Sequence, residues 1–250
     1  MQLSNIEWTE LTWNPTTGCT KVSQGCKNCY AEVMSKRLKA MGVLKYKNGF
    51  KVALHPEELA KPFSWKKRKI VFVNSMSDLF HPEVPLEFIQ SVFDVMNSTN
   101  HIYQVLTKRP ERVKELENKL KWSENIWLGT SVEEETVVKR AVDLVKCGAK
   151  TKFLSVEPLI GPVNSLNLKG IDWVIVGGES GHKARPLKQE WVEHVKTLCK
   201  ISNTPFFFKQ WGKKSFNSNP EDPTIAKEHP MHAKGGCQLN GEVYREMPRV

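Results

Sequence analysis

The chain has 250 residues, of which 40% are hydrophobic, and this composition excludes wholesale disorder. The length suits one large α/β domain or two small ones. No apolar run is long enough for a transmembrane helix, and the first residues show no basic stretch followed by an apolar one. We therefore expect a cytoplasmic protein that does not enter a membrane.

A net charge of +10, from 37 basic and 27 acidic side chains, favours an anionic partner such as DNA, RNA or a nucleotide. A solvated, lysine-rich surface accounts for the charge equally well, because the basic residues are spread along the chain. The densest basic run is Lys66-Lys67-Arg68-Lys69, and no helix-turn-helix pattern accompanies it. The charge makes nucleic acid a candidate partner without identifying it.

Near the start of the chain, a short strand is expected within residues 6–14, and a loop with three cysteines follows it. Cys19, Cys26 and Cys29 are separated by six and by two residues. In a reducing compartment such a group indicates a metal site more often than disulfides. Structural zinc usually takes four ligands, whereas three local thiolates suit a 4Fe-4S cluster with one iron left free for a small molecule. Zinc completed by a distant residue, and three ordinary cysteines, remain alternatives.

Alternating apolar strands and amphipathic helices follow the cysteine loop. A helix is expected over residues 30–41, ended by Gly42, and residues 43–69 are irregular with a possible short helix at 56–61. The strands expected next are 70–73, 101–106, 126–129, 152–155, 172–176 and 205–208, and the helices are 85–98, 110–120, 134–147 and 188–201. Short, almost wholly apolar strands of this kind indicate a parallel sheet buried on both faces. Their spacing predicts an α/β fold with a partial or irregular (β/α) TIM-type barrel; a flat doubly wound sheet is the alternative.

Polar residues gather where each expected strand ends. The carboxyl ends of parallel strands carry the active site in such folds, so we expect one shared site there. Its members are Asn74, Asp78, Lys108, Arg109, Ser131, Glu133, Glu157, Glu179, Lys209 and Gln210.

Residues 213–250 differ in composition, so we divide the chain into a barrel over 1–212 and a C-terminal extension that caps it. Asn240-Gly241 is expected to form a hairpin turn. His229, His232 and Cys237 are a weak metal-ligand pattern, for which solvated loop residues are the alternative.

Several motifs together resemble the phage-associated three-Cys-motif proteins, a family of unknown function that looks like a distant branch of the radical S-adenosylmethionine enzymes. The resemblance covers essentially the whole chain. The motifs that carry it are Trp13-Asn14-Pro15, Gly18-Cys19-Thr20-Lys21-Val22-Ser23, Gly25-Cys26, Cys29-Tyr30-Ala31-Glu32, Asn74-Ser75-Met76-Ser77-Asp78-Leu79-Phe80, Leu106-Thr107-Lys108-Arg109-Pro110, Ser155-Val156-Glu157-Pro158-Leu159, Gly177-Gly178-Glu179-Ser180-Gly181, Lys209-Gln210-Trp211-Gly212 and Leu239-Asn240-Gly241.

The resemblance implies a barrel of the radical S-adenosylmethionine kind, with a 4Fe-4S cluster on Cys19, Cys26 and Cys29. It also implies reductive cleavage of S-adenosylmethionine to a 5′-deoxyadenosyl radical. Two features depart from most enzymes of that kind: the first cysteine gap is longer, and the motif Gly177-Gly178-Glu179 comes late in the chain.

On this basis we assign two sets of residues. Those expected at the cofactor are Asn74, Ser75, Asp78, Ser131, Glu133, Gly177, Gly178 and Glu179; those expected at the substrate are Lys108, Arg109, Glu157, Lys209, Gln210 and Trp211. Lys108 and Arg109 suit a phosphate and Trp211 suits a stacked base, although edge-capping and core packing account for them as well.

The expected function is therefore an iron–sulfur enzyme that modifies or repairs a nucleic acid or nucleotide, with an electron donor and a partner protein as further expected partners. The alternative is an iron–sulfur or zinc module that binds nucleic acid or a partner without turnover. A magnesium-dependent hydrolase built on Asp78, Glu133, Glu157 and Glu179 is the weakest hypothesis.

Overall fold

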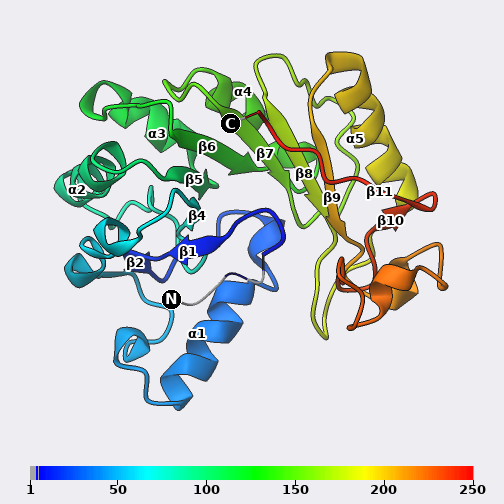
Figure 1. Cartoon of the computed structure of the whole chain (residues 1–250), viewed down its shortest axis with the longest axis horizontal. Helices are drawn as coiled ribbons and strands as arrows, with labels where there is room; N and C mark the ends of the chain where they lie inside the picture. Colours follow the sequence, from blue (N-terminus) through cyan, green and yellow to red (C-terminus); the bar gives the residue numbers. More distant parts are fainter. Residues whose placement is uncertain (1–3, 5, 250) are drawn as a thin grey trace. The chain divides into compact units, whose positions relative to one another are not determined.

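A computed structural model describes residue 4 and residues 6–249, and Figure 1 shows their elements in chain order. The chain forms two compact units, which we describe separately. Among the described residues, the first comprises residues 4, 6–22, 26–130 and 146–151; the second comprises residues 23–25, 131–145 and 152–249. Each unit has its own parallel strands, so the α/β class predicted from the sequence is confirmed within both.

The first unit contains a parallel sheet. Its strands are β1 (Leu11–Trp13), β4 (Ile70–Val73), β5 (Ile102–Thr107) and β6 (Ile126–Ser131), and the last residue of β6 falls in the second unit. Within this sheet, β1 pairs with β4, β4 with β5, and β5 with β6. Most of their side chains are buried, because crossover helices follow β4 and β5 and cover apolar strands of this type.

The helices of the first unit are α1 (Tyr30–Ala40), α2 (Leu86–Asn97) and α3 (Pro110–Leu116). In α2, Ile89, Val92, Phe93 and Met96 recur at helical spacing and are buried, which explains why this segment folds as an amphipathic helix. The chain leaves α1 through Gly42, whose φ of 73° is a conformation that glycine adopts without strain.

A short antiparallel pair, β2 (Thr16–Thr17) with β3 (Ala53–Leu54), joins the start of the cysteine loop to a later segment. We did not predict this pair. Gly18 follows β2 with φ 82°, and a Cβ there would lie 2.1 Å from the carbonyl oxygen of Lys51. The next residue, Cys19, donates its backbone N–H to the carbonyl of Phe50 at 3.2 Å. These contacts fix the backbone of the first cysteine.

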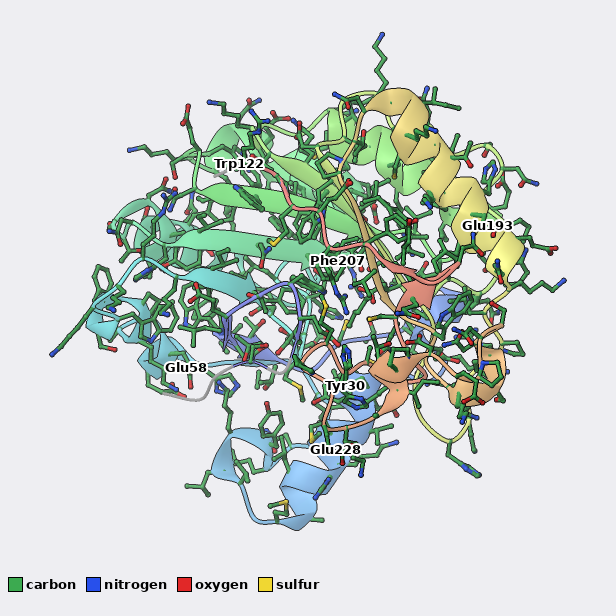
Figure 2. All side chains as sticks on the ribbon, turned by 45° about the vertical axis from the view of Figure 1, so that its right-hand side comes forward. Tyr30, Glu58, Trp122, Glu193, Phe207 and Glu228 are labelled. Carbon is green, nitrogen blue, oxygen red and sulfur yellow. The ribbon has the colours of Figure 1, made fainter. Side chains whose placement is uncertain are left out.

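The second unit has the parallel strands β7 (Lys152–Val156), β8 (Trp173–Gly177) and β9 (Phe206–Gln210) and the helices α4 (Lys139–Val145) and α5 (Gln189–Ser202). The ring of Phe207 on β9 packs against Trp173 on β8 at 5.9 Å between centroids, and Figure 2 labels Phe207 among the strands. The hairpin predicted at Asn240-Gly241 is confirmed: both residues have positive φ and connect β10 (Gln238–Leu239) to β11 (Glu242–Val243).

Several boundaries differ from the prediction. Residues 56–61 form only 3₁₀ turns, and the helix expected over 134–147 is a 3₁₀ turn followed by the seven residues of α4. Residues 130–131 and 209–210 extend β6 and β9 instead of following them. The 3₁₀ turns are η1 (Gln24–Cys26), η2 (Leu44–Tyr46), η3 (Pro56–Glu58), η4 (Lys61–Ser64), η5 (Glu117–Lys119), η6 (Glu135–Val137), η7 (Lys214–Phe216) and η8 (Pro223–Ile225).

None of the helices within residues 4 and 6–249 is both long and apolar enough to cross a membrane. Closure of the strands into a partial barrel and the division at residue 212 stay predictions.

Candidate functional site

The three cysteines of the N-terminal loop are free thiols, as the predicted metal site requires. Cys26 is buried, whereas Cys19 and Cys29 are partly exposed. Cys29 immediately precedes α1, whose first residue, Tyr30, is exposed and labelled in Figure 2. Across the part of the chain that the structure describes, no three His, Cys, Asp or Glu side chains are grouped as metal ligands. The three thiols are therefore not held around a common point in this structure, and their role as metal ligands stays a prediction.

Cys19 lies beside a buried cation. Nη1 of Arg109 donates a hydrogen bond to the Cys19 Sγ at 3.6 Å. The Cys19 thiol itself donates to the carbonyl of Thr20 at 3.4 Å. Burial raises the pKa of the Cys19 thiol to about 11, and the negative charge of Asp78 adds to this effect while Arg109 opposes it. Cys19 is therefore a thiol at neutral pH in this arrangement, which agrees with its donating a hydrogen bond.

Arg109 and Asp78 form a buried ion pair at the ends of β5 and β4. Nη1 of Arg109 lies 2.8 Å from Oδ2 of Asp78, and both side chains are at least nine-tenths buried. The carboxylate also accepts hydrogen bonds from the Thr107 hydroxyl at 2.7 Å and from the backbone N–H groups of Phe80 and Lys108. Both oxygens of the Asp78 carboxylate thus accept hydrogen bonds from this chain, and a buried carboxylate is tolerated when it is paired in this way.

A neutral histidine completes this network. The Nδ1 of His81 accepts from the backbone N–H of Glu83 at 3.1 Å, so its proton is on Nε2, which donates to the Thr20 hydroxyl at 2.8 Å. The same hydroxyl accepts from Nη2 of Arg109 at 3.1 Å. Burial lowers the pKa of His81, and the neighbouring charge of Arg109 lowers it further. A neutral ring is consistent with its position beside a guanidinium.

A cavity of about 500 Å³ opens next to this network in the first unit. A molecule that enters this cavity can reach the side chains of Cys19 and Thr20. The residues that line it are Cys19, Thr20, Phe50, Lys51, Val52 and Glu83.

Asn74 has an unsatisfied polar atom at the carboxyl end of β4. Its backbone has φ 65°, its side chain is buried, and its Nδ2 donates to the Thr16 hydroxyl at 3.0 Å. The Ser77 hydroxyl donates to the Thr16 carbonyl and must accept from the Thr16 hydroxyl, so this amide orientation is the consistent one. The Asn74 Oδ1 has no hydrogen-bond partner within the described part of the chain. A buried acceptor of this kind is costly unless a ligand pairs with it.

Ser75, which we assigned with Asn74, is occupied within the protein. Its hydroxyl pairs with the side-chain amide of Asn14 at 3.1 to 3.2 Å. In the first unit, therefore, Cys19, Asp78 and Arg109 lie together, and the Asn74 Oδ1 has no hydrogen-bond partner among the described residues.

In the second unit, Glu179 is held by Arg185, a residue that we did not predict. Arg185 donates from Nε and Nη2 to the two carboxylate oxygens at 2.9 and 2.6 Å, and its backbone N–H adds a third bond at 2.9 Å. Bidentate pairs are the strongest arginine–carboxylate contacts. Arg185 also donates from Nη1 to the carbonyl of Gln24, within the cysteine loop. The carboxylate of Glu179 is therefore satisfied by the arginine.

Glu133 contacts the same stretch of the cysteine loop. Its carboxylate is fully buried, pairs with Arg140 at 2.9 Å and accepts from the Ser23 hydroxyl at 3.1 Å. A Cβ on Gly25 would lie 2.4 Å from an oxygen of this carboxylate, so a larger residue there would displace the Glu133 side chain. Ser131, also predicted, accepts from Arg140 through its backbone carbonyl.

Glu157 and Lys209 lie together, as the shared-site prediction requires. Their charged atoms are 3.4 Å apart, and a Cβ on Gly177 would meet the Glu157 carboxylate at 2.4 Å. Gly178 has a different constraint, because a Cβ there would lie 2.1 Å from the carbonyl oxygen of Trp211. Both glycines therefore permit close packing inside the unit.

The structure corrects the expectation for Trp211. The side chain is fully buried, its ring packs edge-on against Phe208, and its indole N–H donates to the carbonyl of Gln238 at 2.8 Å. Because neither face is open to a base, core packing is the role that this conformation shows. Gln210 similarly donates to the carbonyl of Gly178.

In the C-terminal segment the Cys237 thiol is buried and directed at the carbonyl of Met231, and this segment holds no metal-ligand group among its described residues.

Comparison with known proteins yields one match. A family model described as a protein of unknown function (DUF5131) matches residues 3–248. No curated protein and no solved structure matches the chain.

Proposed function

The chain belongs to the DUF5131 family, whose function is unknown, and on that premise we propose that it is an iron–sulfur enzyme of the radical S-adenosylmethionine kind. Its substrate would be a nucleic acid or a nucleotide, in keeping with a net charge of +10. Cys19, Cys26 and Cys29 would bind a 4Fe-4S cluster. When bound, such a cluster supplies the electron that cleaves S-adenosylmethionine reductively.

The observation that carries this proposal is the environment of Cys19. The sulfur lies next to a buried guanidinium and borders a cavity of about 500 Å³. The guanidinium opposes the rise in thiol pKa that burial of Cys19 causes, and beside a ligand sulfur it would offset the negative charge that accumulates on a cluster. Arg109 is held in this position by Asp78 and by Thr20, so the cation is fixed before any ligand arrives.

The donor set fits a cluster in its chemistry. Three free sulfurs come from one eleven-residue stretch, and no disulfide engages them. The sulfurs are not already grouped, so the loop side chains must turn toward a common point when the cluster binds. The backbone of Cys19 is fixed by its bond to Phe50, which leaves side-chain rotation as the simplest adjustment at that residue.

Asn74 is the residue best suited to the amine of S-adenosylmethionine. Its Oδ1 is a buried acceptor without a partner, and an ammonium group is a donor that would satisfy it. The neighbouring Asp78 accepts from four donors already and is better placed to position Arg109. Glu179 is engaged by Arg185 in the same way, so we leave it out of the cofactor set.

The test is anaerobic preparation of the full chain with iron and sulfide, followed by metal and sulfide analysis. Incubation with S-adenosylmethionine and dithionite then tests for 5′-deoxyadenosine. The proposal predicts a cluster and formation of the nucleoside. A protein that retains zinc and never binds iron would contradict it.

A binding module without turnover is the second candidate. It is favoured by the same ion pairs that satisfy Asp78, Glu133 and Glu179, since a reaction site usually keeps at least one ionisable group available. Iron binding without cleavage of S-adenosylmethionine is the result that would select it.

A further inference from the structure

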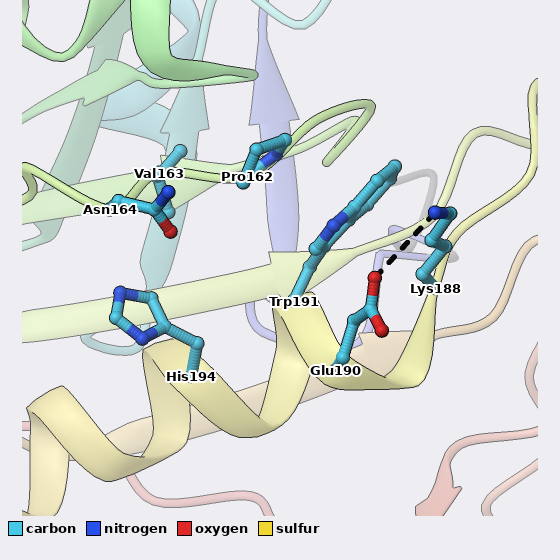
Figure 3. A pocket seen from close by; sticks show the side chains of 7 residues that line it. All are labelled: Pro162, Val163, Asn164, Lys188, Glu190, Trp191 and His194. Atoms are coloured by element: carbon cyan, nitrogen blue, oxygen red, sulfur yellow. Dashed lines mark ion pairs between the residues drawn. The ribbon is translucent and has the colours of Figure 1, made fainter.

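A second cavity, of about 520 Å³, lies at the start of α5 in the second unit. It involves none of the residues that we assigned from the sequence. The residues that line it are Pro162, Val163, Asn164, Lys188, Glu190, Trp191 and His194. Figure 3 shows helix residues on one side of this space and the 162–164 segment on the other.

Trp191 forms one wall of the cavity. On one side of its ring lie Lys188 and Glu190, with Nζ of Lys188 at 5.3 Å from the ring centroid and 3.6 Å from the Glu190 carboxylate. Figure 3 shows Pro162 toward the other side of the indole. The indole is therefore covered by a cation on one face, while its other face is turned toward the cavity. An open slot between an indole and a proline suits a flat ring.

His194 adds a polar requirement to this slot. It follows Trp191 by three residues, so both side chains lie on one face of α5. The Nε2 of His194 is buried and has no hydrogen-bond partner among the described residues. Because almost none of this atom's surface is accessible, the imidazole would have to turn toward the cavity before a donor or an acceptor on the edge of a ligand could pair with it.

We propose that this cavity binds a base of a single-stranded nucleic acid, stacked on Trp191. The edge of the base would face His194 and the exposed amide of Asn164, and the adjacent phosphates would approach Lys188. A base combines the flat ring that the slot suits with the edge polarity that His194 needs. The choice of nucleic acid among planar ligands rests on the proposed function and on the net charge of +10; the cavity itself is independent of the cysteine loop.

The experiment measures binding of fluorescently labelled oligothymidylate and oligouridylate by anisotropy at physiological salt. Trp191→Ala should weaken binding by about tenfold or more, because stacking on one aromatic ring carries that much affinity. Trp191→Phe keeps an aromatic face and should retain most of the affinity, and His194→Ala should give a smaller loss. Ile201→Ala removes an exposed side chain from the same helix and serves as the matched control.

Equal binding by the wild type and Trp191→Ala would overturn the proposal, since it would assign the affinity to general attraction by the basic surface. Absence of binding to either oligonucleotide would overturn it as well. Unchanged circular dichroism and iron content in the Trp191 variants separate this site from the cluster, and loss of oligonucleotide binding with iron retained supports the site. A wild type that binds no iron, while Trp191→Ala still weakens oligonucleotide binding, would refute only the proposed function.

Discussion

Replacing Asp78 with Asn should destabilise the protein strongly, because it breaks the buried ion pair with Arg109. The side chain keeps its size and one acceptor oxygen, which still meets the Thr107 hydroxyl and the backbone N–H of Phe80. Its new NH₂ group replaces the oxygen that accepts from Arg109 and from the backbone N–H of Lys108, so donors would face donors.

The expected cost follows from burial. Only 6% of the Arg109 side chain and 7% of the Asp78 side chain are exposed, so solvent cannot replace the lost partner. Removing one member of a buried pair costs about 3–5 kcal/mol, because the other charge is left uncompensated. Among the described residues, Arg109 would keep the oxygens of Thr20 and the sulfur of Cys19 as acceptors.

The assay is urea-induced unfolding followed by circular dichroism, from which the free energy of unfolding is compared between variants. Glu111→Gln makes the same chemical change at an exposed site and should alter stability by no more than about 0.5 kcal/mol. The double variant Asp78→Asn/Arg109→Gln should lose less than the sum of the two single changes, because the pair is removed together. A loss below about 1 kcal/mol for Asp78→Asn, or strict additivity, would refute the reasoning.

Two further predictions concern the second unit. Gly178→Ala should destabilise it by roughly 1–3 kcal/mol, because the added Cβ meets the backbone carbonyl of Trp211. Gly161→Ala should have a milder effect, because the nearest neighbour of its added Cβ is a side-chain carbon at 3.2 Å. Thermal melting of both variants tests this prediction, and equal losses of stability would contradict it. Burial alone would raise the pKa of Asp222, but hydrogen bonds, the largest from Thr224, lower it overall from 3.8. A lowered carboxyl pKa stabilises the fold above the unfolded value and loses this effect as pH falls through the folded one, so Asp222→Asn should weaken the loss of stability below about pH 4. Urea unfolding at several pH values checks this, and parallel pH profiles for wild type and variant would disprove it.

The strands were predictable because a strand that is buried on both faces requires an unbroken run of apolar residues. Residues 70–73 and 173–176 are of this kind, and the structure begins or ends each strand within a residue of the expected place. The end of α1 was predictable for a different reason, since Gly42 adopts a backbone conformation that few other residues tolerate.

Other features had no sequence signal. The β2–β3 pair has two residues on each strand, too few for a period to show. Arg185 approaches Glu179 through the fold of the loop between them, and nothing in their spacing distinguishes this arginine from a solvated one. Trp211 follows a strand as a binding residue would, and only packing decides that it is buried.

Within the candidate site, the cysteine loop and the polar strand ends pointed to Cys19, Asp78 and Arg109, which lie in contact. They did not indicate that Asp78 and Arg109 would satisfy each other, because pairing between residues on two strands depends on register. Asn74 was predicted as a site residue, but the sequence did not indicate that its buried Oδ1 has no hydrogen-bond partner among the described residues.

The most direct test of the account is iron and sulfide content, with S-adenosylmethionine cleavage, in the wild type and in Cys26→Ala prepared side by side without oxygen. The account predicts a cluster and 5′-deoxyadenosine for the wild type and neither for the variant, which should remain folded by circular dichroism. A folded Cys26→Ala protein that still assembles a complete cluster, or a wild type that never binds iron, would contradict it.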